Sequence, residues 1–76
     1  MIHTLKELPR AEVEYLIDQW VMGRNAERDR EILRQKLVVG VTFDRLAELF
    51  DLSRPRVEQI VYGRLAEIAP HIKKIV

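Results

Sequence analysis

The sequence has no cysteine, only three glycines and three prolines, and only two histidines. Without cysteine there are no disulfides, thiolate metal sites or cysteine nucleophiles. His3 and His71 stand at opposite ends of the chain, without the spacing of a zinc site, so we expect no metal and no cofactor. No apolar run reaches 18 residues and the first ten residues lack the apolar core of a signal peptide. We therefore expect a cytoplasmic protein with no membrane partner.

The chain is short and nearly neutral. Its 76 residues allow one domain, residues 1–76, with a modest core, and thirteen basic against twelve acidic residues give a net charge of +1. The charge is uneven, because residues 53–76 carry five basic and two acidic groups. A local positive patch is the electrostatic footprint of nucleic-acid binding, but on charge alone ordinary surface variation is the favoured interpretation of such a segment.

Apolar periodicity predicts an all-α protein with four helices. Apolar side chains recur at i, i+3, i+4 and i+7, and glycines and capping residues separate the repeats. The expected helices cover residues 10–22, 26–38, 42–50 and 53–69. Asn25, Thr42 and Ser53 are the expected N-caps, and Gly23 and Gly40 suit the left-handed turns that end helices. The predicted architecture is a compact four-helix domain.

The last two predicted helices are joined only by Asp51 and Leu52, together with the Ser53 cap. So short a connection favours a steep crossing, which is the arrangement of a helix-turn-helix, here within residues 42–69. Ala47 is small where the helices would approach, and Leu52 is an apolar residue inside the turn. Short helical pairs also occur in bundles that never touch DNA, and that alternative stays open.

The side of the last helix that faces away from the core carries the candidate DNA contacts. At 100° per residue, Val57, Ile60, Val61, Leu65 and Ile68 point inward, and Pro55, Gln59, Tyr62 and Ala66 point outward. Arginine suits the guanine edge and glutamine the adenine edge in the major groove. The candidate base contacts are Arg54, Arg56, Gln59 and Glu58, and the candidate phosphate contacts are Thr42, Arg45, Ser53, Tyr62 and Arg64.

The segment LSRPRVEQI at residues 52–60 carries a family resemblance. Together with residues 26–51 and 61–68, it resembles region 4 of bacterial sigma-70-type factors and small sigma-region-4-like helix-turn-helix proteins of bacteria and phages. The resemblance implies a recognition helix that reads a −35 promoter element, with Arg54 and Gln59 as base readers. Pro55 and Glu58 depart from the family pattern, so the same promoter element is not expected.

These observations predict a small transcription regulator that binds double-stranded DNA. Trp20, Val21 and Met22, near the end of the first helix, form a candidate surface for a homodimer or for RNA polymerase, and core packing is the alternative for them. The competing hypothesis is a protein-interaction module, an RNA polymerase-binding or anti-sigma-like adaptor that uses the helix-turn-helix as scaffold. We do not expect an enzyme, because the sequence has no Gly-rich phosphate loop, metal-ligand cluster or Ser/His/Asp arrangement.

Overall fold

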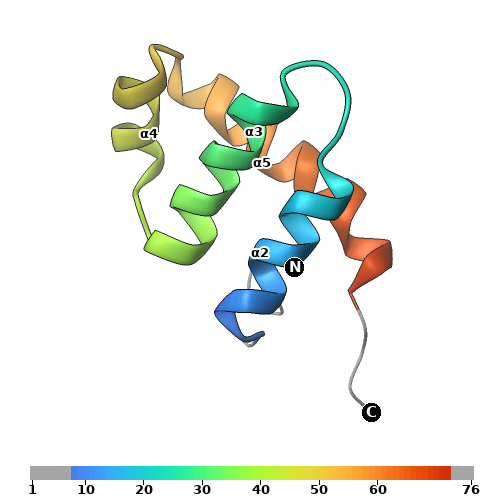
Figure 1. Cartoon of the computed structure of the whole chain (residues 1–76). Helices are drawn as coiled ribbons and strands as arrows, with labels where there is room; N and C mark the ends of the chain where they lie inside the picture. The colour runs from blue at the N-terminus through green and yellow to red at the C-terminus, as the bar shows by residue number, and fades with distance from the viewer. Residues whose placement is uncertain (1–7, 73–76) are drawn as a thin grey trace.

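The computed structural model describes residues 8–72, which are all-helical and contain no strand. Four α-helices follow one another, and Figure 1 shows their arrangement. Their bounds are α2 Arg10–Trp20, α3 Ala26–Arg34, α4 Phe43–Phe50 and α5 Arg54–Ile68. A π-helix, η1 (Gln35–Val39), continues α3, and a 3₁₀ turn, η2 (Ala69–His71), continues α5. The all-α prediction is confirmed, while His3 lies outside the described residues. None of the helices within residues 8–72 has the length and apolar character needed to cross a bilayer.

The connection between α2 and α3 uses two left-handed residues. α2 starts directly after Pro9 and ends at Trp20, two residues earlier than predicted, with Val21 in an extended conformation. Gly23 and Asn25 have φ angles of 89° and 61°, as expected for residues that tolerate this region. Asn25 takes the N-cap position of α3, but its side chain makes no capping hydrogen bond. A capping side chain needs an extended backbone at its own residue, and the left-handed conformation prevents this.

The second predicted helix changes type in its last part. The α-helix ends at Arg34, and residues 35–39 widen into one π turn. The Gln35 carbonyl accepts hydrogen bonds from the amides of Gly40 (2.9 Å) and Val41 (3.0 Å). The wider turn shifts the side chains around the axis, and Leu37 and Val38 both pack against the core. Gly40, with a φ of 93°, ends the segment in a left-handed conformation, as predicted.

Side-chain caps define the starts of α4 and α5. The Thr42 hydroxyl accepts a hydrogen bond from the Arg45 amide (3.2 Å), and the Ser53 hydroxyl accepts one from the Arg56 amide (3.2 Å). Both residues therefore cap as predicted. Pro55 lies in the first turn of α5, where its missing N–H leaves no helical bond unmade.

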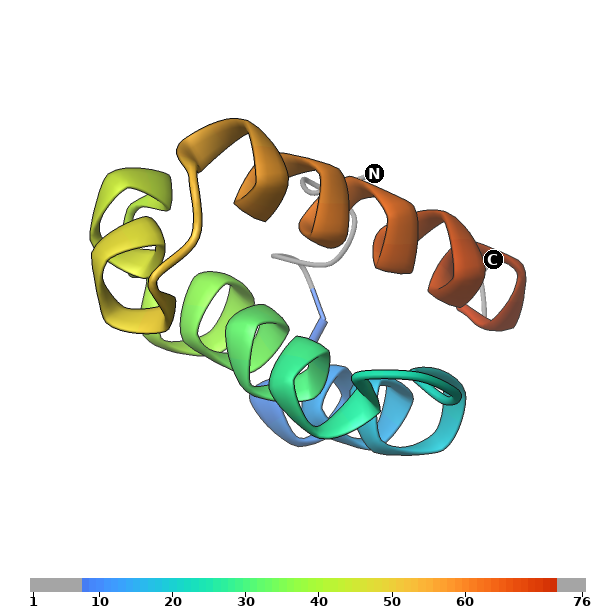
Figure 2. The same cartoon turned by 90° about the horizontal axis from the view of Figure 1, so that it is seen from above.

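The core is apolar and draws on all four helices. α5 runs along the molecule, with α4 at one end and α2 and α3 packed beneath it (Figure 2). Five α5 side chains are buried, and they are the five predicted to point inward. The fully apolar cluster consists of Val13, Leu16, Ile17, Val21, Ile32, Leu33, Leu46, Val57, Ile60, Val61, Leu65 and Ile68.

An arginine of α3 ties α2 to it. The Arg34 guanidinium pairs with Glu31 (2.7 Å) on its own helix and with Asp18 (3.1 Å) and Glu14 (3.6 Å) on α2. These groups are partly exposed, so each pair stabilises the fold only modestly. They lie beside the buried face of α2, which is formed by Val13, Leu16 and Ile17.

Candidate nucleic-acid interface

A three-residue connection holds α5 against α4. Asp51 adopts a left-handed φ of 54°, and the Leu52 amide donates a hydrogen bond to the Ala47 carbonyl (3.0 Å). Ala47 and Leu52 are partly buried and pack against the core, as their size and polarity predict. The start of α5 is thereby held in one position relative to α4.

The side of α5 that faces away from the core is open to solvent. The residues predicted to point outward are all exposed, namely Pro55, Gln59, Tyr62 and Ala66, and so are Arg54 and Arg56. Glu58 is partly buried. The first half of α5 therefore presents two arginines and a glutamine to solvent.

The Arg54 guanidinium is engaged by two carboxylates. It pairs with Asp44 of α4 (3.2 Å) and with Glu58 of its own helix (2.9 Å). The hydrogen bond with Glu58 and the charge of Asp44 raise the pKa of Arg54 above its ordinary value, so its positive charge persists at every ordinary pH. Its side chain stays 53% exposed, which leaves it able to exchange these partners for another acceptor.

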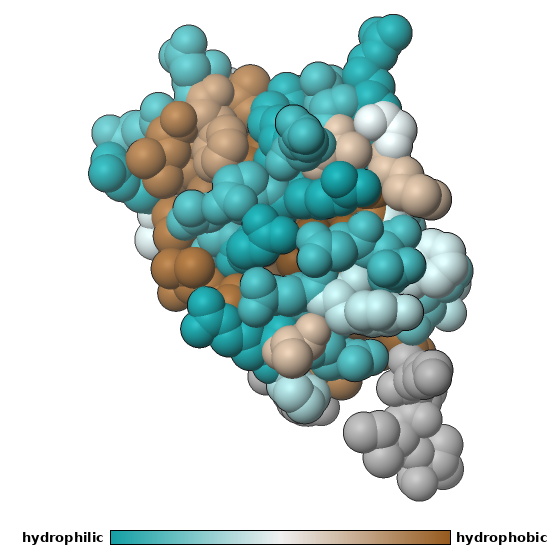
Figure 3. All heavy atoms as spheres, viewed as in Figure 1, coloured by the Kyte–Doolittle hydropathy of each residue, from teal (hydrophilic) through white to brown (hydrophobic). Residues whose placement is uncertain are grey.

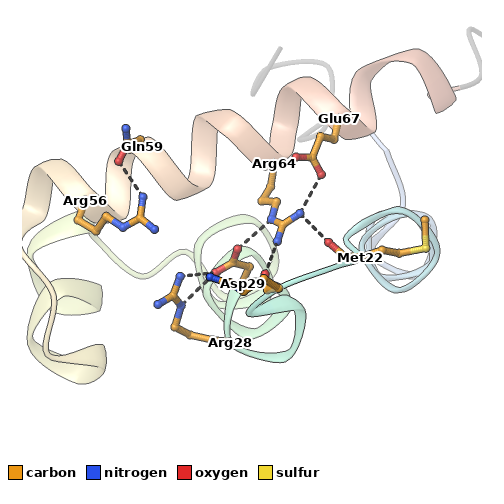
Figure 4. Close-up of polar contacts among 8 residues, drawn as sticks. Met22, Arg28, Asp29, Arg56, Gln59, Arg64 and Glu67 are labelled. Carbon is orange, nitrogen blue, oxygen red and sulfur yellow. Dashed lines mark hydrogen bonds and ion pairs between the residues drawn. The ribbon is translucent and has the colours of Figure 1, made fainter.

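Arg56 and Gln59 form a second pair, one helical turn apart. The Arg56 guanidinium donates a hydrogen bond to Gln59 Oε1 at 2.8 Å (Figure 4). Arg56 makes no ion pair with another residue in the described part of the chain. Its charge, unlike that of Arg54, is not balanced by a neighbouring carboxylate there.

Four of the candidate phosphate contacts lie at the surface. Thr42, Ser53, Arg45 and Tyr62 are all exposed. The two hydroxyls accept capping bonds, which leaves each hydroxyl proton available to donate. Arg45 has a long 4.0 Å ion pair with Glu48. The Tyr62 ring lies 5.9 Å from that of Phe43 and is 51% exposed.

Arg64, the fifth candidate phosphate contact, is engaged within the fold. Its side chain is only 14% exposed, and its guanidinium donates to Asp29 (2.8 Å), Glu67 (2.9 Å) and the carbonyls of Met22 (2.9 Å) and Arg24 (3.0 Å) (Figure 4). Burial lowers the pKa of Arg64, but hydrogen bonds to the two carboxylates outweigh it and the net pKa is raised. The guanidinium is therefore committed to joining α5 to α3 and to the connection before it.

The three residues of the candidate partner surface at the end of α2 differ in exposure. Val21 is fully buried and belongs to the core, so it contributes nothing to an outer surface. Trp20 is 36% exposed and Met22 57% exposed. Val21 follows the buried Ile17 by four residues, and its backbone, although extended, still donates its N–H to the Ile17 carbonyl.

Sequence reasoning missed the carboxylates that engage these arginines. Glu58 follows Arg54 by four residues, and this spacing is itself a signal of a helical ion pair. Asp44 precedes Arg54 by ten residues and Asp29 precedes Arg64 by 35, so these contacts depend on how the helices cross. Lys36 lies over the ring of Phe43 at 4.2 Å, another contact between segments that no local pattern indicates.

The described part of the chain holds no group of three or more side chains suited to bind a metal ion. Comparison with models of protein families, with curated proteins and with solved structures found no match for this chain.

Proposed function

We propose that this protein is a small transcription regulator that binds double-stranded DNA, with α4 and α5 as a sigma-region-4-like helix-turn-helix. The observation that carries the proposal is the joint exposure of Arg54, Arg56 and Gln59 on one side of the first half of α5. These side chains would enter the major groove, where arginine pairs with guanine O6 and N7 and glutamine with adenine N6 and N7. Glu58 would accept from cytosine N4.

The caps of α4 and α5 would position the helices on the DNA backbone. Helix N-termini direct unpaired N–H groups and a partial positive charge outward, which suits a phosphate. The hydroxyl protons of Thr42 and Ser53 lie at these two starts. Arg45 and Tyr62, both exposed, would add contacts to the sugar–phosphate chain.

Binding through one such module would be weak. Single modules bury about 600–1,000 Å², and Arg54 must give up Asp44 and Glu58 before it reaches a base. A second copy of the chain or a larger partner such as RNA polymerase would supply the missing affinity.

Salt dependence tests the proposal directly. A labelled DNA duplex is titrated with the protein at about 50 and 200 mM salt, and the logarithm of affinity should fall with a slope of about −0.9 per neutralised phosphate. Absence of binding at the lower salt concentration, up to the highest soluble protein concentration, would refute DNA binding.

Substitutions test the division of roles after selection of a binding site from random oligonucleotides. Gln59→Ala should relax the preference at one base pair and cost about 1–3 kcal/mol on the selected site. Arg45→Ala should weaken selected and random sequences alike. Arg10→Ala is the matched control, because it removes the same charge from an exposed α2 residue. Equal losses on both kinds of DNA for Gln59→Ala would contradict its role as a base reader.

A second candidate is a protein-interaction module that binds RNA polymerase or a sigma-like protein. Residues 42–59 carry three basic and four acidic groups, and Arg54 is already paired. Figure 3 shows hydrophobic surface, in brown, over α4 and η1. Leu49 of α4 is 50% exposed and Val39 of η1 is 63% exposed. In this case the duplex titration shows no binding, immobilised RNA polymerase retains the protein, and Leu49→Ser lowers the retained amount.

A further inference from the structure

A pocket beside α2 has no part in the proposed DNA interface. It encloses about 400 Å³ and is lined by Glu12, Tyr15, Leu16, Trp20 and His71. The first four residues come from α2, at a spacing that places them along one side of the helix. His71 comes from η2, at the right of Figure 1, and its ring contacts that of Trp20 at the end of α2. The pocket therefore depends on the docking of the chain after α5 against α2.

Aromatic rings form the walls of this pocket. The rings of Trp20 and His71 are stacked, with centroids 3.4 Å apart and planes 2° from parallel. Tyr15 contributes a third ring and is 57% exposed, while Leu16 is buried and forms an apolar floor. The stack already holds the Trp20 side chain in place. A ligand that contacts Trp20 therefore loses little binding free energy to immobilising that side chain.

The carboxylate of Glu12 in the pocket differs in its ion pairing from those of Glu14 and Asp18 on the same helix. Glu14 and Asp18 of α2 are both engaged by Arg34. Glu12 is partly buried, yet it has no ion pair and no side-chain hydrogen bond with another residue among 8–72. The pocket thus combines aromatic walls with a single negative charge that the described fold does not use.

We infer that this pocket binds an arginine side chain of a partner protein. A guanidinium stacks on aromatic faces and donates two parallel hydrogen bonds to a carboxylate, which matches the walls and Glu12. At about 400 Å³ the pocket has room for a single arginine side chain. The inference uses α2 and η2 alone and stands whether or not α5 binds DNA.

The test uses the only tryptophan of the chain as its reporter. The full-length protein is titrated with the peptide acetyl-Gly-Ser-Arg-Ser-Gly-amide while the fluorescence of Trp20 is recorded. We expect a saturable change with a dissociation constant of about 1 mM, the weak range for one exposed contact. The same peptide with citrulline, the neutral analogue of arginine, should give no saturable change.

Substitutions locate the binding. Glu12→Gln should weaken the peptide about threefold to fivefold, as should loss of the aromatic wall in Tyr15→Ser. Glu27→Gln is the matched control, since Glu27 is an exposed residue of α3 with no ion pair in the described structure. Far-UV circular dichroism spectra that superpose with that of the wild type establish that the variants fold.

Three outcomes would overturn the inference. One is an equal response to the arginine and citrulline peptides, and another is an equal effect of Glu12→Gln and Glu27→Gln. The third is a concentration-dependent dimer, seen by sedimentation and lost in Glu12→Gln, which would assign the pocket to a second copy of this chain.

Discussion

Replacement of Arg64 by alanine removes a contact that joins three segments of the fold. The guanidinium uses four hydrogen bonds, two to carboxylates and two to the carbonyls of Met22 and Arg24. Its main partner, Asp29, is only 4% exposed and is the one buried charged residue in the described chain. The substitution therefore leaves a buried carboxylate without its strongest partner.

The magnitude follows from what remains around Asp29. Removal of one partner of a buried ion pair costs about 3–5 kcal/mol. Arg28 still pairs with Asp29 at 3.0 Å, and water can reach the exposed Met22 and Arg24. We therefore expect a loss of about 2–3 kcal/mol in the free energy of unfolding. At about 4–8 °C per kcal/mol for a domain of this size, the melting temperature falls by about 10–20 °C.

Urea denaturation followed by circular dichroism at 222 nm measures this loss. Arg28→Ala is the control, because it removes a partly exposed partner of the same carboxylate and should cost at most about 1 kcal/mol. A double-mutant cycle with Asp29→Ala should give a coupling of about 1–3 kcal/mol between Arg64 and Asp29. If Arg64→Ala costs no more than Arg28→Ala, or the coupling is below about 0.5 kcal/mol, the structural role assigned to Arg64 is wrong.

Three further predictions concern caps, glycines and the aromatic stack. Ser53→Ala should lower the free energy of unfolding by about 1 kcal/mol in urea melts, while Ser53→Asp retains most of the cap. Gly40→Ala should cost about 1–2 kcal/mol because its φ is 93°. Gly63→Ala should instead gain about 0.5–1 kcal/mol, since it lies within α5 with nothing near an added Cβ, and a loss there would contradict this contrast. His71→Ala should shift Trp20 emission to longer wavelength by removing the stacked ring, and an unchanged spectrum would refute the stack.

Much of the helical framework follows from local sequence patterns. Apolar spacing placed the inward face of α5 correctly, and Thr42 and Ser53 cap the helices predicted for them. These features depend on residues three or four positions apart, whose relation is set by the helix itself. The π turn after Arg34 was not predicted, because it arises where Leu37 and Val38 pack on a core formed by other helices.

For the candidate site residues, too, features set by the helix itself were predicted and contacts between distant residues were not. The exposure of Gln59 and Tyr62 follows from helical angle alone, and it was predicted. The engagement of Arg54 by Asp44 and of Arg64 by Asp29 joins residues 10 and 35 positions apart.

By itself, the sequence determined where the helices lie and which side of α5 meets the core, since regular backbone hydrogen bonding gives apolar residues a fixed angular period. Only the tertiary structure decided which charges are already paired, that Val21 is buried, and that His71 stacks on Trp20. Those outcomes depend on how the helices cross and on the path of the connections between them. Patterns among residues three or four positions apart do not determine either.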